Sequence, residues 1–409
     1  MTTKNTFLLL FLLTIVSCNK NNKKQATIAA EIIEISSPID KGGEPNLFVS
    51  ETGKVYLSWV AYVNDSTHAL MFSTLENSTW AAPKTIASGI NWFVNWADFP
   101  SIVATNNDQY LAAHWLQMRD TGTYDYDVRI GQSTDGGNTW SESFTPHTDS
   151  ISAEHGFVSM LPNSDRRIIA TWLDGRNMSN DDSDAAENSM TVRFAEFDQK
   201  HNLSNEAVLD TRTCECCDTD LTMTSNGPVV IYRNRSADEI RDISIVRKVN
   251  GHWTAPKLIF ADHWKIQGCP VNGPAIASIG NTLAVGWFTA ANDTAKVKVV
   301  FSADGGETFS KPVSVDDGTP IGRVDVVMLS NEKILVSWME NTQDGSEIRG
   351  AIVTKSGKQG ESFVLSKTNA SRTSGFPILV KSGNRIILAW TDAQEDMTTV
   401  KTAELILDY

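Results

Sequence analysis

The stretch from Asn272 to Pro312, NGPAIASIGNTLAVGWFTAANDTAKVKVVFSADGGETFSKP, decides the fold class. It contains apolar segments at 274–278, 283–288 and 297–301, separated by Gly, Asn and Asp and followed by the turn 302–309. Alternation, β-branched residues and turn residues predict strands of about five residues, and no segment carries a helical period. A small sheet of this kind cannot bury both faces alone, so we expect it to recur.

The apolar run that ends in Trp recurs along the whole chain. The repeated position is held by Trp59, Trp115, Trp172, Arg233, Trp287, Trp338 and Trp390. Its spacings of 56, 57, 61, 54, 51 and 52 residues predict an all-β protein, a seven-bladed β-propeller of four-stranded blades. The last unit, from Phe376, supplies only three strands, whereas Ala26–Ser37 is a strand with no partner nearby. We therefore expect the N-terminal strand to complete the last blade and close the ring.

The N-terminus predicts export. Residues 1–17 have the basic start and apolar run of a signal peptide. The segment Ile15-Val16-Ser17-Cys18 resembles a bacterial lipobox, which would make Cys18 the lipid-modified first residue; an ordinary cleaved signal is the alternative. Residues 18–25 then form a tether, and 26–409 form one propeller domain. We expect a monomeric lipoprotein anchored in the outer membrane, facing the periplasm or the cell surface.

Two turns share the pattern S-x-D-x-G-x-T-[WF], at Ser133–Trp140 and Ser302–Phe309, and worn copies end at Trp80 and Trp253. We expect the Asp to accept backbone N–H groups within the turn and Gly to supply positive φ. The pattern resembles the Asp box, or BNR repeat, of sialidases and sialidase-like propellers. In that family these turns lie on the face away from the active site. The resemblance thus gives Asp135 and Asp304 structural roles.

Polar residues also recur in register with the repeat. One set lies 15 or 17 residues before the Trp position: Glu44, Asp98, His155, Asp218, Asn272, Arg323 and Gly375. A second set lies two residues after it: Ala61, Gln117, Asp174, Arg235, Thr289, Glu340 and Asp392. Innermost strands start, and second strands end, at the same face of a propeller. We expect an inner and an outer ring around one mouth of the channel, either as a binding site or as an ordinary wet surface.

Charge within these rings predicts the ligand class. Several guanidinium groups at one mouth suit a carboxylate ligand, whereas the formal net charge of −14 and the lack of a basic run argue against nucleic acid. Sialidases hold the sialic-acid carboxylate with three arginines and use an Asp acid/base and a Tyr nucleophile activated by Glu. The resemblance assigns Arg235, Arg323 and Arg372 to the clamp, Asp98 to the acid/base and Glu340 to the assisting acid, with Tyr124 or Tyr126 as nucleophile. Further candidate ligand contacts are Arg233, Arg241, His155, Asp218, Asn272 and Asp325.

The chain departs from the sialidase pattern in several ways. Blade 1 has no Arg-Ile-Pro motif, neither ring contains Tyr, and sialidases have six blades. A structural network in which the arginines pair with Asp238, Glu239 and Asp242 is the alternative to a ligand clamp.

Four cysteines precede inner-ring positions on neighbouring blades. Cys214, Cys216 and Cys217 lie just before Asp218, and Cys269 lies before Asn272. With Cys18 lipidated, an even number remains in an oxidising compartment, which favours at least one disulfide involving Cys269. A soft-metal site with His155 or His263 is the alternative, although C-x-C-C fits no common zinc spacing. We expect no cofactor.

The sequence therefore predicts a sialidase-like exported propeller that recognises an acidic glycan at one mouth of its channel. Hydrolysis of that glycan, as by an exo-α-sialidase-like glycoside hydrolase, is a further expectation, and whether the protein is an enzyme stays open. The alternatives are a non-catalytic binding or assembly scaffold, and a redox or metal-handling lipoprotein that uses the cysteine cluster.

Overall fold

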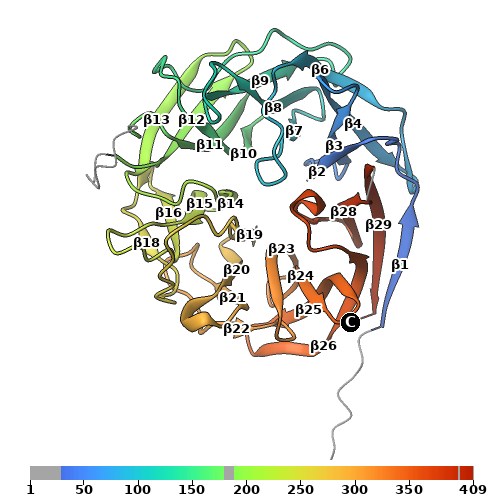
Figure 1. Cartoon of the computed structure of the whole chain (residues 1–409), viewed down its shortest axis with the longest axis vertical. Coiled ribbons are helices and arrows are strands. Elements are labelled where there is room, and N and C mark those ends of the chain that lie inside the picture. The colour runs from blue at the N-terminus through green and yellow to red at the C-terminus, as the bar shows by residue number, and fades with distance from the viewer. Residues whose placement is uncertain (1–28, 179–187, 395–396, 409) are drawn as a thin grey trace, which may run out of the picture.

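The structure is a computed structural model that describes residues 29–178, 188–394 and 397–408. Its regular structure is almost entirely β-strand, with two short 3-10 helices, η1 (Ala291–Asp293) and η2 (Arg372–Ser374). The strands form seven antiparallel sheets around a central axis, which confirms the predicted propeller (Figure 1). No helix within the described ranges is long and apolar enough to cross a bilayer. The signal peptide, Cys18 and most of the tether lie outside the described residues.

Each blade begins with its innermost strand. Blade 1 comprises β2 (Gly42–Val49), β3 (Val55–Tyr62), β4 (Thr67–Glu76), β5 (Thr79–Trp80) and β6 (Lys84–Ile90). Blade 2 comprises β7 (Ser101–Thr105), β8 (Tyr110–Met118) and β9 (Tyr126–Ser133). Blade 3 comprises β10 (His155–Ser164), β11 (Arg167–Asp174), β12 (Thr191–Asp198) and β13 (Leu203–Asp210). In blade 2 the fourth position is a single bridge between Ile130 and Phe144.

The remaining blades follow the same order. They comprise β14 (Asp220–Thr224), β15 (Gly227–Arg233), β16 (Ile243–Val249), β17 (His252–Trp253) and β18 (Lys257–Leu258); β19 (Ala275–Ile279), β20 (Thr282–Thr289), β21 (Lys296–Ser302) and β22 (Val313–Ser314); β23 (Pro320–Ser330), β24 (Lys333–Thr342), β25 (Gly345–Thr354) and β26 (Gly357–Thr368); and β27 (Ile378–Ser382), β28 (Arg385–Ala393), β29 (Thr398–Asp408) and β1 (Ala29–Ile35).

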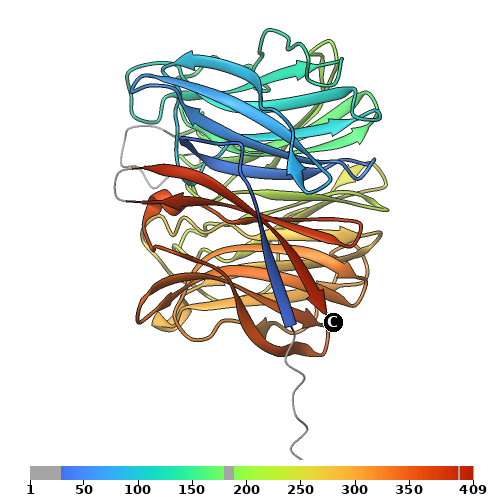
Figure 2. The same ribbon diagram turned by 90° about the vertical axis from the view of Figure 1, so that its right-hand side faces the viewer.

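The N-terminal strand closes the ring, as predicted. β1 pairs antiparallel with β29, in a register that runs from Ala29 opposite Asp408 to Ile35 opposite Thr402. Figure 2 shows these two ends of the chain side by side at the outer edge of blade 7. The Thr402 hydroxyl donates to the Ile35 carbonyl at 2.9 Å and accepts the indole N–H of Trp80, from blade 1, at 2.9 Å. Closure therefore covers the strand edge of β29 that would otherwise be exposed.

Apolar side chains fill the space between neighbouring blades. The core divides into seven clusters, one at each blade-to-blade interface. The six Trp residues of the repeat are buried, at 0 to 8% exposure. They anchor the interfaces because one large ring packs against both adjacent sheets. Arg233 occupies the seventh such position at 1% exposure.

The two full turn motifs have the predicted internal bonding. The Asp135 carboxylate accepts the backbone N–H of Thr139 at 2.9 Å and its hydroxyl at 2.7 Å, and Asp304 binds Thr308 in the same way. Gly136 and Gly137 have φ of +71° and +79°, where a Cβ would be strained. These turns follow the ends of β9 and β21, which pair with the starts of β8 and β20. They therefore lie on the face opposite the predicted mouth.

Candidate functional site

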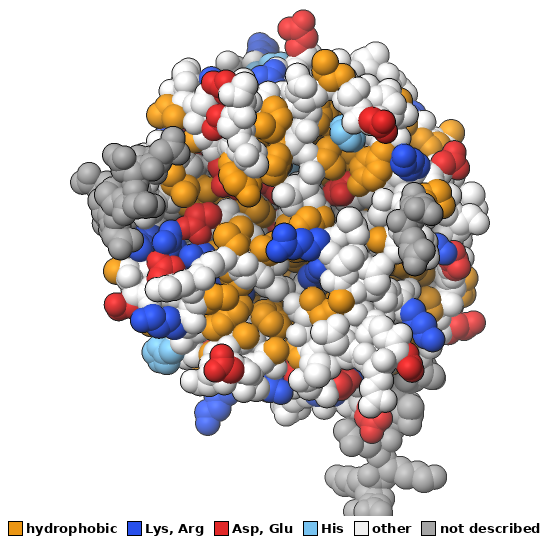
Figure 3. All heavy atoms as spheres, viewed as in Figure 1, with side chains coloured by type: hydrophobic (Ala, Val, Ile, Leu, Met, Phe, Trp, Pro, Cys, Tyr) orange, Lys and Arg blue, Asp and Glu red, His pale blue; other side chains and the backbone are white. Residues whose placement is uncertain are grey.

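The inner-ring and outer-ring positions lie together at one face. Strand pairing places His155 opposite Asp174, and it places Glu340 opposite Pro320, close to Arg323. Figure 3 shows this face, on which basic side chains lie near the centre and acidic and basic side chains intermingle beside blade 4. We call it the mouth.

Hydrogen bonds to the repeated Trp explain why carboxylates recur at outer-ring positions. Trp172 donates its indole N–H to Asp174 at 2.8 Å, and Trp338 donates to Glu340 in the same way. Glu340 also accepts the backbone N–H of Thr319 at 2.6 Å, and it is 3% exposed. An acid two residues after the repeated Trp thus accepts a hydrogen bond from a buried indole N–H. Glu340 is therefore engaged in hydrogen bonds within the protein.

Two inner-ring side chains link their blade to the next one along the chain. Asp98 accepts the backbone N–H of Phe157 at 2.7 Å, and Asn272 accepts that of Arg323 at 2.7 Å. Both donors have positive φ, 52° and 54°, so the polar side chain holds a backbone kink at the start of the neighbouring blade. Asn272 acts here as a connector between blades 5 and 6.

Three carboxyl groups face the central channel. The channel contains a cavity of about 320 Å³ whose lining includes Asp218, Asp220 and Asp325. Burial raises the pKa of Asp220 and of Asp325 to about 7, and burial together with the charges of Asp98 and Asp220 raises that of Asp218 well above its ordinary value. These acids favour the neutral form, because ionised carboxylates in this lining would be poorly solvated and would repel one another.

A tyrosine and two carboxyl groups meet at the mouth between blades 2 and 3. The Tyr126 hydroxyl lies 2.9 Å from a Glu154 oxygen and 3.2 Å from an Asp98 oxygen. Tyr126 and Asp98 are buried, whereas Glu154 is partly exposed. The structure therefore brings two of the predicted catalytic residues together and adds Glu154, which the sequence analysis did not single out.

This triad holds protons near neutral pH. Burial, with the Asp98 charge adding to it, raises the pKa of Glu154 to about 8, and burial raises that of Asp98 to about 7. The Tyr126 hydroxyl can donate to only one carboxyl at a time, so a proton on the other satisfies the remaining contact. A carboxyl group that keeps its proton near pH 7 beside a tyrosine is equipped for general acid catalysis.

Glu340 and Tyr124 do not join this triad. Glu340 is bound within blade 6, and Tyr124 is 58% exposed with its ring stacked edge-on against Phe93.

A histidine and carboxylate cluster adjoins the triad. The rings of His147 and His155 stack with centroids 3.9 Å apart, and His155 Nε2 lies 3.2 Å from Asp149. Arg176 contacts Asp149 at 2.7 Å and Asp174 at 2.6 Å. Burial lowers the pKa of His147 to about 3, so this ring is neutral. The guanidinium already neutralises the carboxylates, which makes the cluster a closed ion-pair network rather than an open ligand site.

The blade 4 arginines are engaged in a second network. Arg235 pairs with Glu215 and, at 2.8 Å, with Glu239; Arg241 contacts the same two acids at 2.9 and 3.0 Å. The alternative of a structural arginine network is therefore present, with Glu215 and Glu239 as its acids. Asp242, also considered as a partner, instead accepts the backbone N–H groups of the 263–264 segment.

Arg233 and Arg323 are turned inward. Arg233 donates to three backbone carbonyls at 2.7 to 2.9 Å and lies 4.9 Å from the Trp264 ring. Arg323 is 4% exposed, donates to the Gly375 carbonyl at 2.7 Å and lies over Trp96 at 4.8 Å. Burial lowers the pKa of Arg323 to about 10. Both guanidinium groups donate their hydrogen bonds to backbone carbonyls, so in this arrangement neither faces a ligand.

Arg372 differs from these arginines. It is exposed in η2, directly before blade 7, and within the described ranges it forms no ion pair. Of the three arginines assigned to the clamp, Arg372 alone keeps its charge available at the mouth.

The cysteines lie beside the triad. Cys214, Cys216 and Cys217 converge in the loop before β14, and Cys269 adjoins them from the loop before β19. All four are free, and the predicted disulfide is not formed. Neither His155 nor His263 joins them among the metal-capable groups of the described chain.

Comparisons with known proteins agree on the fold. No family model matches the chain, and no curated protein matches it. A protein of unknown function from Dyadobacter fermentans has a TM-score of 0.53 at 13% identity, with 94% of this chain and 99% of that one covered. The polysaccharide lyase Uly1 has a TM-score of 0.50 at 10% identity, with 91% of each chain covered. The K499G mutant of the NanB sialidase from Streptococcus pneumoniae has a TM-score of 0.46 at 10% identity, with 91% of this chain and 70% of that one covered.

Proposed function

We propose that the protein binds and processes an acidic glycan at the mouth, with the Tyr126–Glu154–Asp98 triad as the proton-transfer group. The observation that carries the proposal is the Tyr126 hydroxyl held between two carboxyl groups, of which Glu154 is the partly exposed one. A tyrosine paired with a glutamate is also the arrangement that the resemblance to sialidases led us to expect. The likeness to the Uly1 lyase, a fold-level analogy, adds support for glycan chemistry in general.

The assignment of roles follows exposure. Glu154 donates its proton to the leaving oxygen of the sugar, while Tyr126 and Asp98, both buried, hold Glu154 in place and share the proton. Arg372, which forms no ion pair with another described residue, supplies the cation that attracts the acidic group of the glycan. A general acid of this kind contributes a factor of about 100 to 10,000 in rate.

The test compares matched glutamate variants on fluorogenic sialosides and on uronate-containing polysaccharides. We expect Glu154→Gln to lower kcat at least about 100-fold. Glu332→Gln, an exposed glutamate at the opposite face, should leave kcat unchanged. Wild-type activity should fall as the pH rises through about 8, because Glu154 then loses its proton. Release of an unsaturated sugar would indicate elimination, and its absence with new reducing ends would indicate hydrolysis. Turnover by Glu154→Gln equal to the wild type would refute the proposal.

Export and lipid anchoring remain part of the proposal. Cys18 lies outside the described residues, so the support is the resemblance of 15–18 to a lipobox. Mass spectrometry of the N-terminal peptide from membrane fractions tests it. A diacylated Cys18 is expected, and an unmodified N-terminus further along the chain would contradict the anchor.

A further inference from the structure

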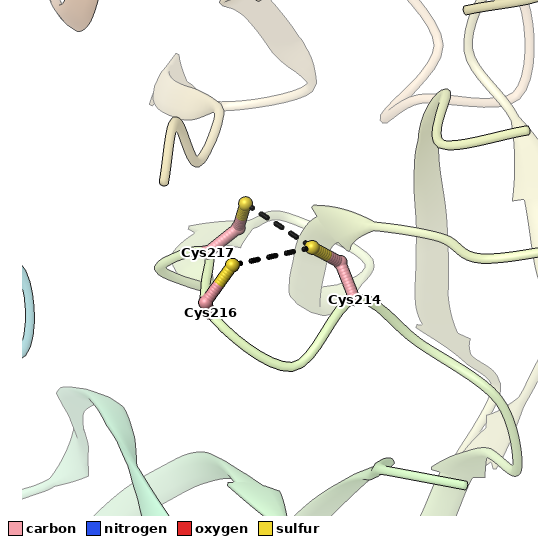
Figure 4. A group of neighbouring side chains, drawn as sticks. All are labelled: Cys214, Cys216 and Cys217. Carbon is pink, nitrogen blue, oxygen red and sulfur yellow. Dashed lines mark hydrogen bonds between the residues drawn. The ribbon is translucent and has the colours of Figure 1, made fainter. Parts of the chain in front are cut away.

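The strongest unassigned feature is the convergence of thiols before β14. Figure 4 shows the sulfur atoms of Cys214, Cys216 and Cys217 pointing toward one another from one tight loop. Cys214 Sγ lies 3.3 Å from Cys217 Sγ and 3.9 Å from Cys216 Sγ, and the three sulfurs lie within 4.8 Å of one another. Cys269 reaches the group from the next blade by a thiol contact with Cys216. A thiol from a second loop thus contacts the three that converge in the first.

The spacing suits ligands around a shared centre. Four sulfurs bound tetrahedrally to one ion at about 2.3 Å lie about 3.8 Å from each other. The distances of 3.3 and 3.9 Å bracket this value, and no two of these sulfurs form a disulfide. A single disulfide would use only two of these three sulfurs. A central ion would engage all three at once.

A buried guanidinium group lies against one of the three sulfurs and stabilises the thiolate form of that sulfur. Arg241 Nη1 lies 3.1 Å from Cys214 Sγ, and its side chain is 4% exposed. The deprotonated sulfur is the form that binds metals. A guanidinium N–H beside a ligand sulfur is the kind of outer contact that orients and tunes a metal site.

We propose that Cys214, Cys216 and Cys217, with Cys269 as the fourth ligand, bind one thiophilic d¹⁰ ion, Zn²⁺ or Cu⁺. All-thiolate donor sets select these ions over hard cations such as Mg²⁺ and Ca²⁺. Any thiol still protonated releases its proton to solvent on binding, and no oxidant is needed. The partly exposed Cys216 and the exposed Cys269 form the side from which an ion enters. The site ties the loop before blade 4 to the loop before blade 5.

The other clusters with metal-ligand chemistry do not compete. In the group formed by Asp149, His155 and Asp174, the Arg176 guanidinium lies against both carboxylates. In the group formed by Asp127, His147 and His155, the Nδ1 atom of His155 lies 3.0 Å from a backbone carbonyl and must donate to it. A nitrogen that carries a proton for a carbonyl has no lone pair for a metal.

The test measures metal bound per chain. The purified protein is reduced, stripped of metal with a chelator under anaerobic conditions, and titrated separately with Zn²⁺ and Cu⁺ against a chromophoric competitor. We expect about one ion bound per chain. The ion that the protein retains against the stronger competing chelator is the one that the site prefers. Binding should be lost in Cys214→Ser/Cys217→Ser and retained in His147→Gln/Asp127→Asn, which alters the other cluster. Failure of the reduced wild type to bind either ion overturns the proposal, and so does full binding by the double serine variant.

A second readout on the wild type covers the case in which the serine variant does not fold. Thiol alkylation of the native protein, counted by mass spectrometry, should modify the two accessible thiols, Cys216 and Cys269, in the metal-free form and spare both once the ion is bound. Equal modification with and without metal refutes the site. This readout does not depend on glycan turnover, so it can fail or succeed independently of the proposed enzymatic function.

Discussion

Replacing Arg233 by Met is the sharpest test of how the structure divides its arginines between architecture and ligand binding. Arg233 occupies the position held by Trp in the other six blades, is 1% exposed and donates to the carbonyls of Arg241, Asn272 and Phe288. Each buried carbonyl that loses its donor costs about 1–3 kcal/mol, and the contact with the Trp264 ring adds about 1–2 kcal/mol. Removing a buried charge returns part of its desolvation cost, several kcal/mol. We therefore expect a net loss of roughly 3 kcal/mol in unfolding free energy.

The assay is urea unfolding followed by Trp fluorescence, with Arg235→Met as the matched control. Arg235 is 22% exposed at its side chain and its two acids keep Arg241 as a partner, so its loss should cost about 1 kcal/mol or less. A ligand-clamp role for Arg233 would produce the reverse: a normal unfolding midpoint with weakened glycan binding. Midpoints of Arg233→Met and wild type that agree within error would refute the structural reasoning.

Three further predictions follow from the fold and its buried charges. A chain that starts at Glu44 lacks β1, leaves β29 as an open edge and should aggregate; soluble material that unfolds cooperatively in size-exclusion and melting experiments would contradict ring closure by this strand. Arg323→Ala should lower the melting temperature by more than Arg372→Ala, because only Arg323 binds buried carbonyls; equal melting temperatures would count against this. Burial raises the folded-state pKa of Asp325 from 3.8 to about 7, so its stabilising contribution is complete below about pH 4 and is lost as the pH rises through 7. Asp325→Asn should therefore reduce the decline in unfolding free energy between pH 4.5 and 7.5. The reduction is at most about 4 kcal/mol, and screening by channel water makes it smaller. A decline that urea unfolding finds unchanged in the variant would refute this prediction.

Blade number and ring closure could be predicted from the sequence because both depend on local periodicity. The Trp positions recur every 51 to 61 residues, and each Trp is buried between two sheets, so the repeat directly reports the packing. The unpaired strand near the N-terminus and the short last unit were enough to infer the pairing of β1 with β29. The glycines and aspartates of the two turns were equally informative, since their bonding is confined to a few adjacent residues.

Which polar side chains are free to act could not be predicted in the same way. Glu340 lies at an outer-ring position of the repeat, but its place there is explained by the hydrogen bond that it accepts from the Trp338 indole. Arg233 and Arg323 lie at mouth positions in sequence, yet their partners are carbonyls on neighbouring blades, such as Asn272 for Arg233 and Gly375 for Arg323. Glu154 was missed because it directly precedes an inner-ring residue, and its partner Tyr126 is 28 residues away. Availability depends on partners from another blade, which a repeat pattern does not specify.

The distribution of charge at the mouth explains how an acidic glycan could bind beside so many carboxyl groups. Four carboxylates at the mouth lie in ion pairs: Glu215 and Glu239 with blade 4 arginines, and Asp149 and Asp174 with Arg176. In the triad and the channel, the buried acids Asp98 and Asp218 and the partly exposed Glu154 have raised pKa values, which favours the neutral form. Arg372 is exposed and, among the described residues, has no carboxylate as an ion-pair partner. A negatively charged ligand therefore meets less repulsion from these acids below about pH 7, and the proton on Glu154 that reduces the repulsion is also the one that the proposed chemistry uses.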